Sequence, residues 1–222
     1  MNDLNHVAFI MDGNGRWGIK KKNSRNFGHK EGVKVVKRIV SSSVKLKIPF
    51  VTFYVFSSEN WKRPKKETIY LFKLIKNYFL KEIERVVREG IKINVIGEMY
   101  NIPKDTKLAL NKAKALTKHN KKICVNLAIN YGSHNEIIQA CKKTSKNINY
   151  RNLKNKLYTK DMPYPDILIR TGGYQRLSNF MLWQLAYTEL YFLKKMWPDF
   201  NERDLKNILK KFKNLKRNYG KI

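Results

Sequence analysis

The stretch HVAFIMDGNG at residues 6–15 decides what kind of fold is expected for this chain. Residues 6–11 form a short, continuous apolar run, and Asp12-Gly13-Asn14-Gly15 follows it at once. An uninterrupted apolar run of this length is typical of a strand buried on both faces, and the glycines and Asn14 are typical of a tight turn. The sequence therefore predicts a buried strand that enters a tight turn bearing one carboxylate, Asp12.

Apolar runs and helical periodicity alternate along the rest of the chain in the same way. Further strands are predicted at residues 50–56, 91–96, 123–129, 166–169 and 190–193. Helices are predicted over residues 33–44, 71–87 and 106–116, from His134 onward, and from Asn201, which has Asp204 three residues later. Apolar strands separated by helices favour a single α/β domain, residues 1–222, with a parallel sheet covered on both faces; the polar stretch 142–165 is its one weak segment.

The composition narrows the possible partners and the compartment. The 222 residues include 47 basic and 17 acidic side chains, a net charge of +30, which favours an anionic partner: a diphosphate, a nucleic acid or a membrane face. The lysines are spread over most segments, so a compositional bias explains the charge equally well. Two cysteines build no disulfide framework, and no apolar run approaches the roughly 18 residues of a membrane span, so a reduced, cytoplasmic chain is expected.

Glycine and polar residues follow four of the predicted strands. These runs are Asp12 to Gly18, Ser57 to Pro64, Asn130-Tyr131-Gly132 and Arg170-Thr171-Gly172-Gly173. In an open parallel sheet, ligands bind beyond the carboxyl ends of the strands. The four runs therefore predict a rim suited to phosphate groups.

The first of these runs matches the dinucleotide-binding pattern G-x-G-x-x-G through Gly13, Gly15 and Gly18. That pattern needs an acidic ribose ligand about twenty residues later, at the end of the second strand. Here the second strand ends only near Phe56, and Asp12 would repel a bare pyrophosphate unless a divalent cation stood between them. A nicotinamide or flavin enzyme is therefore disfavoured.

A diphosphate cradle is the more economical use of this loop. Its glycines let backbone N–H groups approach diphosphate oxygens while Asp12 holds Mg²⁺, and Arg16, Arg25 and His29 complete the cradle. Each residue also has an ordinary structural explanation: Asp12 as a helix cap, Arg25 as a solvated charge and His29 as part of a polar helix face. A second basic group, Arg170, Arg176 and Ser178, predicts a second diphosphate site. Two such sites imply two phosphorylated substrates.

Few other carboxylates stand near these motifs in the sequence. They are Glu59, Glu67 and Glu189, so no hydrolytic carboxylate pair is evident. The apolar helix 71–87 and the strands 50–56 and 123–129 either form an ordinary core or wall a tunnel for an apolar chain, and the pattern alone leaves both open.

Taken together, the motifs resemble the cis-prenyltransferase family, with bacterial undecaprenyl diphosphate synthases as the nearest branch. The strings that carry the resemblance are HVAFIMDGNGRW at 6–17, FGH at 27–29, FSSENW at 56–61 with Arg63-Pro64, NYG at 130–132, RTGG at 170–173 and ELYF at 189–192. They run in the family's order from His6 to about Phe200.

The resemblance implies a homodimer whose subunits each have a six-stranded, mostly parallel sheet wrapped by helices, with a hydrophobic tunnel at the carboxyl ends of the strands. It implies a Mg²⁺-dependent enzyme that adds isopentenyl diphosphate repeatedly, in cis, to an allylic starter, typically farnesyl diphosphate. The expected product is undecaprenyl diphosphate, the lipid carrier for cell-wall polysaccharide. The expected location is the cytoplasm, with transient contact at the inner membrane face for product release.

The family's roles are carried over residue by residue. Asp12 is implied to be the metal-linked carboxylate, with Glu189 of the partner subunit as a further ligand. The backbone from Gly13 through Gly15 to Arg16, with Arg25 and His29, is implied to hold the allylic diphosphate, and Arg170, Arg176 and Ser178 the isopentenyl diphosphate. Asn14, Ser57, Trp61 and Arg63 match positions that organise the reacting ends, and Trp17 and Glu59 are further substrate-binding candidates. On chemical grounds, Trp17, Phe56 and Trp61 are suited to shield the reacting centre from water. Asp12, Asn14 or the departing diphosphate is the expected proton acceptor.

Three positions depart from the family pattern. Tyr174 stands where the family usually has Glu, the segment 142–165 is shorter than in well-known bacterial members, and Arg217 is one residue out of place for a C-terminal Arg-x-Gly string. Two rival classes remain. A nucleic-acid-binding protein is disfavoured because no helix-turn-helix, zinc or RNP string is present. A non-catalytic scaffold subunit is disfavoured by the intact Asp12, Arg170 and Arg176.

Overall fold

The computed structural model describes residues 3–144 and 148–216. The strands are β1 (His6–Ile10), β2 (Phe50–Ser57), β3 (Ile91–Ile96), β4 (Ile123–Tyr131), β5 (Ile167–Arg170) and β6 (Glu189–Phe192). The helices are α1 (Asn14–Lys22), α2 (Arg25–Lys45), α3 (Lys65–Arg88), α4 (Lys104–Leu116), α5 (Ser133–Thr144), α6 (Tyr150–Lys154) and α7 (Glu202–Lys213), with the 3-10 turns η1 (Ser58–Lys62) and η2 (Trp197–Asp199). Arg217 lies outside the described residues.

The six strands form one sheet in the order β3-β4-β2-β1-β5-β6, and every neighbouring pair is parallel. The expected α/β fold with a six-stranded parallel sheet is confirmed. Because Ile10 pairs with both Tyr54 and Arg170, the ends of β1, β2 and β5 meet at one edge. The loops that follow these strands therefore lie side by side, as the rim prediction requires.

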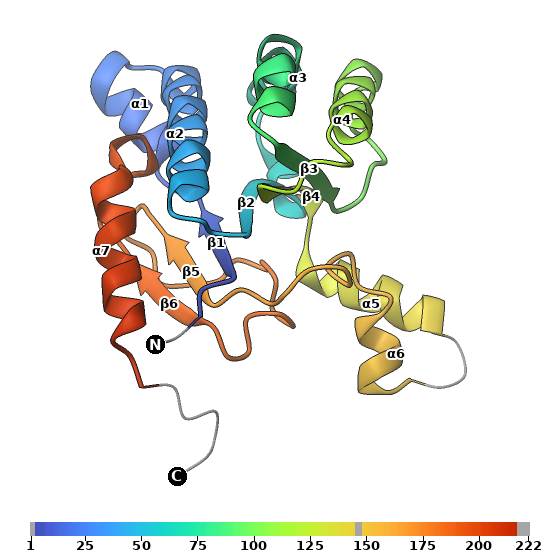
Figure 1. The fold of residues 1–222 in the computed structure, drawn as a ribbon. Coiled ribbons are helices and arrows are strands. Elements are labelled where there is room, and N and C mark those ends of the chain that lie inside the picture. The colour runs from blue at the N-terminus through green and yellow to red at the C-terminus, as the bar shows by residue number, and fades with distance from the viewer. Residues whose placement is uncertain (1–2, 145–147, 217–222) are drawn as a thin grey trace.

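Each face of the sheet buries its own apolar cluster. One face packs against α2, α3, α4 and α7, which stand on the same side of the sheet in Figure 1. The other face packs against Met162, Phe180, Met181 and Leu185, which come from the chain between α6 and β6. Both faces are covered as expected, but the second is covered largely by irregular chain.

Helix α1 is a correction to the sequence interpretation, which has residues 12–15 as a tight turn only. Gly13 takes a left-handed backbone conformation, φ 101°, and ends the turn as the cap of a nine-residue helix. The helix carries Lys20, Lys21 and Lys22 in its last turn, where their positive charges interact favourably with the negative end of the helix dipole. The apolar periodicity of residues 14–22 is too weak to predict this helix from the sequence.

A β-bulge in β2 changes which way its last side chains point. The pairing of β2 with β4 is regular up to Tyr54, and Phe56 then pairs with Ile129, so Val55 is an extra residue on β2. A second shift follows at once, since Ser57 pairs with Tyr131. Val55 and Phe56 consequently both face the α2–α3 side of the sheet. Bulges commonly re-aim side chains next to active sites.

The N-cap expected from Asn201 and Asp204 is confirmed. The Asn201 side chain accepts hydrogen bonds from the N–H groups of Arg203 and Asp204, and the Asp204 carboxylate accepts one from the Asn201 N–H. Helix α7 then buries Leu205, Ile208, Leu209 and Phe212 against the sheet.

His6 lies fully buried at the start of β1. Its Nδ1 lies 2.7 Å from the Pro163 carbonyl oxygen and its Nε2 2.7 Å from Thr52 Oγ1. Burial lowers the pKa of His6 to about 4, although the Pro163 carbonyl and Asp166 oppose that shift. Between these two pKa values the His6 imidazole therefore stays neutral in the folded protein but is protonated in the unfolded chain.

The stability of the protein is expected to fall as the pH falls from about 6.5 towards 4. Because the pKa of His6 is about 4 in the folded protein and about 6.5 in the unfolded chain, the free energy of unfolding falls by about 3 kcal/mol across that interval. Denaturant unfolding at pH 7 and pH 4.5 measures this loss. His6→Gln is the matched control, because glutamine has no proton to gain; an equal loss in the variant contradicts the assignment.

Candidate active site

The Asp12 main chain is fixed from two sides at the carboxyl end of β1. Its carbonyl oxygen accepts hydrogen bonds from Trp197 N, at 3.0 Å, and Thr171 Oγ1, at 2.8 Å. Its own N–H donates to the Ile10 carbonyl at 3.0 Å. The loop after β1 is therefore held against the loops after β5 and β6, and the Asp12 side chain keeps 27% exposure.

The Asp12 carboxylate joins the two basic groups that the sequence analysis treats separately. Its Oδ2 lies 2.9 Å from Arg170 Nη2, and its Oδ1 lies 3.2 Å from Arg16 Nη2. The same Arg16 nitrogen donates to the Gly172 carbonyl at 2.7 Å. Two motifs about 160 residues apart thus form one site around a single carboxylate.

Arg170 lies almost fully inside the protein at the end of β5, with its side chain only 4% exposed. Its Nη1 donates to Ser178 Oγ at 2.8 Å and to the carbonyl oxygen of Arg176. These bonds fold the loop after β5 back over the strand end. The expected grouping of Arg170, Arg176 and Ser178 is found.

A second part of the site is built around Glu67, in the first turn of α3. Its carboxylate, 8% exposed, lies 2.9 Å from Arg25 Nε, 3.1 Å from His29 Nε2 and 3.2 Å from Arg63 Nη1. Three side chains that the resemblance assigns to substrate are thus held by one acidic residue. In the sequence Glu67 stands out only as a carboxylate near the candidate loops. The signal that was available is its place four residues after Arg63, in the first turn of α3.

The charges of this cluster follow from its contacts. Burial favours the neutral acid at Glu67, but the hydrogen bonds and charges of Arg25, Arg63 and His29 outweigh it and lower the pKa of the carboxyl. Burial lowers the pKa of His29, while Glu67 acts in the opposite direction. A hydrogen bond to Glu67 raises the pKa of Arg25. At neutral pH the cluster therefore holds two guanidiniums, one carboxylate and a neutral imidazole.

Trp61 and Asn14 lie at fixed positions near this cluster. Trp61 Nε1 donates to Asn130 Oδ1 at 2.8 Å, and the indole packs against Phe56 and Phe72 with ring centroids 5.0 and 5.3 Å away. Asn14 Nδ2 donates to the Met11 carbonyl at 2.9 Å, and its buried Oδ1 has no hydrogen-bond partner among the described residues. That oxygen is therefore a buried acceptor whose hydrogen bond is unmade.

Three expected site residues, Trp17, Glu59 and Ser57, make contacts outside the Asp12 and Glu67 clusters. Trp17 stacks on Phe27 and donates its Nε1 to Asp199 Oδ1 at 2.8 Å. Glu59 accepts from Asn179 Nδ2 at 2.8 Å, and the Ser57 N–H donates to Asn60 Oδ1 at 3.2 Å in the turn η1.

Glu189 pairs with Ile167 at the start of β6, whereas Phe192 pairs with Arg170. Glu189 therefore lies about 10 Å along the strand from the level of Arg170, towards the amino-terminal ends of the strands. A role for Glu189 at Asp12 of the same chain does not fit this placement, and its role across a dimer stays a prediction.

An apolar cavity lies between α2, α3 and the sheet, next to Asp12. Its volume is about 120 Å³, and Met11 and Asn14, on either side of the Asp12-Gly13 turn, are among its walls. The remaining walls are His29, Gly32, Val33, Val36, Val55, Leu71, Leu74, Ile75, Tyr78, Phe79, Leu127, Ile129 and Trp197. The helix and strands that the sequence left open as core or tunnel wall contribute both to the buried core and to this cavity, as Phe79 and Leu127 show. A tunnel for an apolar chain stays a prediction.

The site has the donor set for a magnesium ion carried by a phosphorylated substrate. Mg²⁺ is usually bound by one or two carboxylates together with substrate phosphates and water. Asp12 offers one partly exposed carboxylate. No group of three or more His, Cys, Asp or Glu side chains gathers to bind a metal within residues 3–144 and 148–216. Asp12 fits a magnesium ion held mainly by diphosphate, and not one held by a protein cage.

A carboxylate and several guanidiniums beside an apolar cavity, on an open parallel sheet, are the features of an α/β protein suited to phosphorylated compounds with an apolar part. The comparisons with known proteins narrow this class. A family model described as putative undecaprenyl diphosphate synthase, of the prenyltransferase type, matches residues 10–220. The chain belongs to this family of prenyltransferases.

Relatives agree with this assignment. The chain is 42% identical over 227 residues to an isoprenyl transferase of Clostridium tetani, covering 98% of this chain and 89% of the relative. It is 40% identical to an isoprenyl transferase of Rickettsia typhi, covering all of both chains.

Two solved structures have the same fold. Lavandulyl diphosphate synthase from Lavandula x intermedia, in complex with dimethylallyl diphosphate, superposes with a TM-score of 0.94 at 32% identity, over 98% of each chain. A probable undecaprenyl diphosphate synthase from Campylobacter jejuni superposes with a TM-score of 0.85 at 33% identity, over 100% of each chain.

Proposed function

We propose that this chain condenses isopentenyl diphosphate repeatedly, in cis, onto an allylic diphosphate, with farnesyl diphosphate as the starter. The proposed product is a long-chain polyprenyl diphosphate, undecaprenyl diphosphate, that carries cell-wall polysaccharide units. The observation that carries the proposal is the contact of Asp12 with both Arg16 and Arg170 beside the apolar cavity. This arrangement supports two diphosphates at one carboxylate and an apolar chain behind it.

The residues support a mechanism in which charge builds up on a departing diphosphate. Breaking the allylic carbon–oxygen bond leaves negative charge on that diphosphate, and preplaced donors stabilise this charge better in the transition state than in the ground state. Arg16, Arg25 and the backbone N–H groups after Gly13 are the proposed donors. Mg²⁺, when bound at Asp12, would neutralise part of the same charge.

The second substrate supplies the attacking double bond. Arg170, Arg176 and Ser178 are proposed to hold its diphosphate so that its apolar end meets the allylic carbon. The cavity walls keep water from the carbocation-like centre. Three groups remain candidates for accepting the final proton: Asp12, Asn14, whose buried oxygen is unpartnered, and the departing diphosphate.

The proposal is tested by incubating the purified protein with labelled isopentenyl diphosphate, farnesyl diphosphate and Mg²⁺, and then sizing the apolar products. Label in a series of products that ends at one long chain supports it, and label that stays in isopentenyl diphosphate contradicts it. The cavity of about 120 Å³ favours a second candidate, a shorter polyprenyl product, because ligand pockets are commonly about 300–1,000 Å³. The same sizing experiment separates the two.

Replacing Arg176 with alanine is expected to raise the KM for isopentenyl diphosphate about tenfold or more, because a charge-assisted contact to phosphate is lost. The KM for the starter should change by less than about twofold. Steady-state kinetics with each substrate varied in turn measure both values. Arg25→Ala is the reciprocal variant and should raise the starter KM; equal effects on both substrates in each variant mean that the two sites are merged or exchanged.

A homodimer is part of the proposal. Strand β6 is an edge of the sheet, Leu190 on it is 43% exposed, and Glu189 lies far from the Asp12 of its own chain. Sedimentation equilibrium tests this directly, since a mass of one chain across the micromolar range contradicts it.

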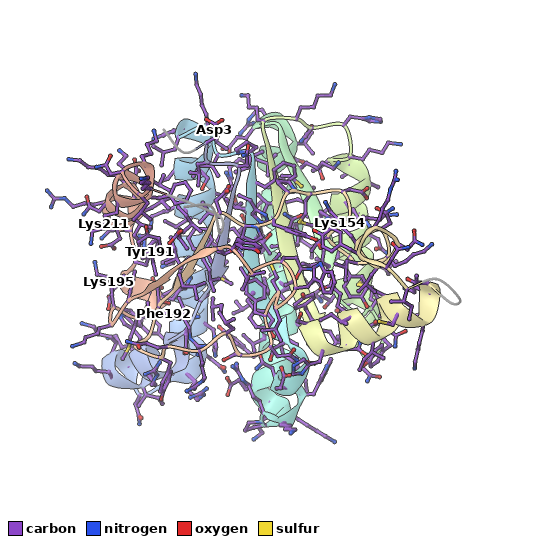
Figure 2. The ribbon with its side chains drawn as sticks, turned by 90° about the horizontal axis from the view of Figure 1, so that it is seen from below. Asp3, Lys154, Tyr191, Phe192, Lys195 and Lys211 are labelled. Atoms are coloured by element: carbon purple, nitrogen blue, oxygen red, sulfur yellow. The ribbon has the colours of Figure 1, made fainter. Side chains whose placement is uncertain are left out.

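Contact with a membrane face is also proposed, from a cytoplasmic location. Within the described residues, no helix combines the length and apolarity needed to cross a bilayer. Helix α3 has an outer stripe with Ile69 64% and Leu80 62% exposed, and Lys73 stands between them. Basic side chains lie on both halves of the molecule, with Lys195 and Lys211 on one side and Lys154 on the other in Figure 2. The protein is expected to sediment with anionic vesicles, and Leu80→Asp should weaken this binding. If the protein sediments equally with neutral vesicles, the proposal is contradicted.

A further inference from the structure

Tyr174 lies in the middle of the arginine side chains of the site. The centroid of its ring is 4.1 Å from the guanidinium carbon of Arg176, 4.7 Å from that of Arg16 and 5.9 Å from that of Arg170. All three distances are within the range in which a cation is attracted to the face of an aromatic ring. The side chain is 42% exposed, so it is not part of the core.

The ring links the two halves of the site. Arg16 comes from α1, on the side proposed for the allylic diphosphate, and Arg176 comes from the loop after β5, on the side proposed for isopentenyl diphosphate. Asp12 forms ion pairs with Arg16 and Arg170. Within the described part of the chain, Arg176 has no carboxylate at ion-pairing distance, so the ring of Tyr174 is the group that faces its guanidinium.

A ring orients a guanidinium differently from a carboxylate. A carboxylate takes up the N–H groups at the edge of the guanidinium and neutralises its charge. An aromatic ring contacts the flat face and leaves the N–H edge and the whole charge available. A diphosphate needs that edge and that charge.

We propose that Tyr174 is a positioning residue that holds Arg16 and Arg176 ready for the two diphosphates while leaving the Arg176 guanidinium unneutralised. The inference rests on the proposed function, because it takes the two arginines to belong to two diphosphate sites. The face of the ring performs this role, and the hydroxyl does not. A carboxylate at position 174 would compete with the substrates for the same two side chains.

The test compares Tyr174→Leu, Tyr174→Phe and Tyr174→Glu with the unaltered protein. Binding of inorganic diphosphate by titration calorimetry, without Mg²⁺, is the first measurement. Tyr174→Leu should weaken it about five- to tenfold, because two cation–ring contacts are lost, and Tyr174→Phe should keep it within about twofold. Tyr174→Glu should weaken it more than Tyr174→Leu, because it adds a competing negative charge.

The second measurement is the kinetics of the same variants. A positioning role predicts that Tyr174→Leu raises the KM for isopentenyl diphosphate by a similar factor and changes kcat by less than about threefold, with recovery in Tyr174→Phe. Thermal unfolding of each variant checks the fold, and the exposed position makes a large change in Tm unexpected.

The outcomes separate this inference from the proposed function. Diphosphate binding by Tyr174→Leu that equals that of the unaltered protein overturns the inference alone. A loss in Tyr174→Phe as large as in Tyr174→Leu also overturns it, because the hydroxyl would then carry the effect. A protein that binds diphosphate in the expected order of variants but transfers no prenyl group supports the role of Tyr174 and overturns the proposed function. A chain that binds no diphosphate overturns both.

Discussion

Replacing Asp12 with alanine is expected to lower the initial rate of prenyl transfer by about a thousandfold, the effect of removing a group that stabilises charge in a transition state. Asp12 is the carboxylate that contacts both arginine groups and the one proposed to carry the metal. Its side chain is 27% exposed, and its main chain makes the bonds that fix the loop. The fold should therefore survive the change.

The structure shows a cost of this variant that the sequence does not reveal. Asp12→Ala removes the carboxylate from Arg170, whose side chain is only 4% exposed, and leaving a buried charge without its partner costs about 3–5 kcal/mol. Asp12→Asn is the cleaner variant, because the amide oxygen still accepts a hydrogen bond from one arginine while the charge is gone. Initial rates and thermal unfolding are measured for both. An unchanged initial rate in either variant contradicts the metal role of Asp12.

The strands and their order along the chain were predictable because a strand buried on both faces needs a continuous apolar run. The meeting of Asp12 with Arg170 was predictable in outline, since parallel strands bring their carboxyl ends to one edge. What the sequence did not contain was the pairing order that makes β1 and β5 neighbours. That order is decided by packing of the whole chain.

Helix α1 was missed because its glycines argue locally against a helix. The structure shows why they are there: a Cβ on Gly18 would lie 2.2 Å from the Ser24 carbonyl oxygen and 2.5 Å from the Gly28 nitrogen. The two helices α1 and α2 approach so closely that only glycine fits. A contact between two elements thus overrides the local preference of one.

Glu67 was missed as the centre of a cluster for a related reason. Arg63 is four residues away on the chain, but Arg25 and His29 are about 40 residues away and reach Glu67 only when α2 packs beside α3. Figure 1 shows these two helices standing next to each other over the sheet. Candidate binding residues at strand ends are visible in the sequence, whereas Glu67, which holds them, becomes visible only once α2 packs beside α3.

Replacing Val55 with phenylalanine is expected to shorten the main product and to reduce the yield of the longest product about tenfold or more. One or a few extra carbons in an apolar pocket change the rate for a substrate that must fit there by about that factor. Val55 is the bulge residue of β2, and its side chain forms part of the cavity wall. The cavity of about 120 Å³ has little spare room. If the product grows into this cavity, it has to push α3 away from α2, where the Lys37–Glu82 ion pair, at 2.8 Å, joins the two helices. A ring at position 55 takes up the space that this movement opens.

Val55→Ala is the matched control, because it removes bulk at the same position without adding charge. It should give products at least as long as those of the unaltered protein, while Val55→Phe should accumulate intermediates a few isoprene units short. Products are sized after dephosphorylation, and the rate of the first addition is measured separately. If chain growth runs through this cavity, the first addition keeps its rate in Val55→Phe, because the starter's reacting end lies at Asp12 and only later additions need the depth. An unaltered product distribution in Val55→Phe means that the growing chain leaves the site by another route.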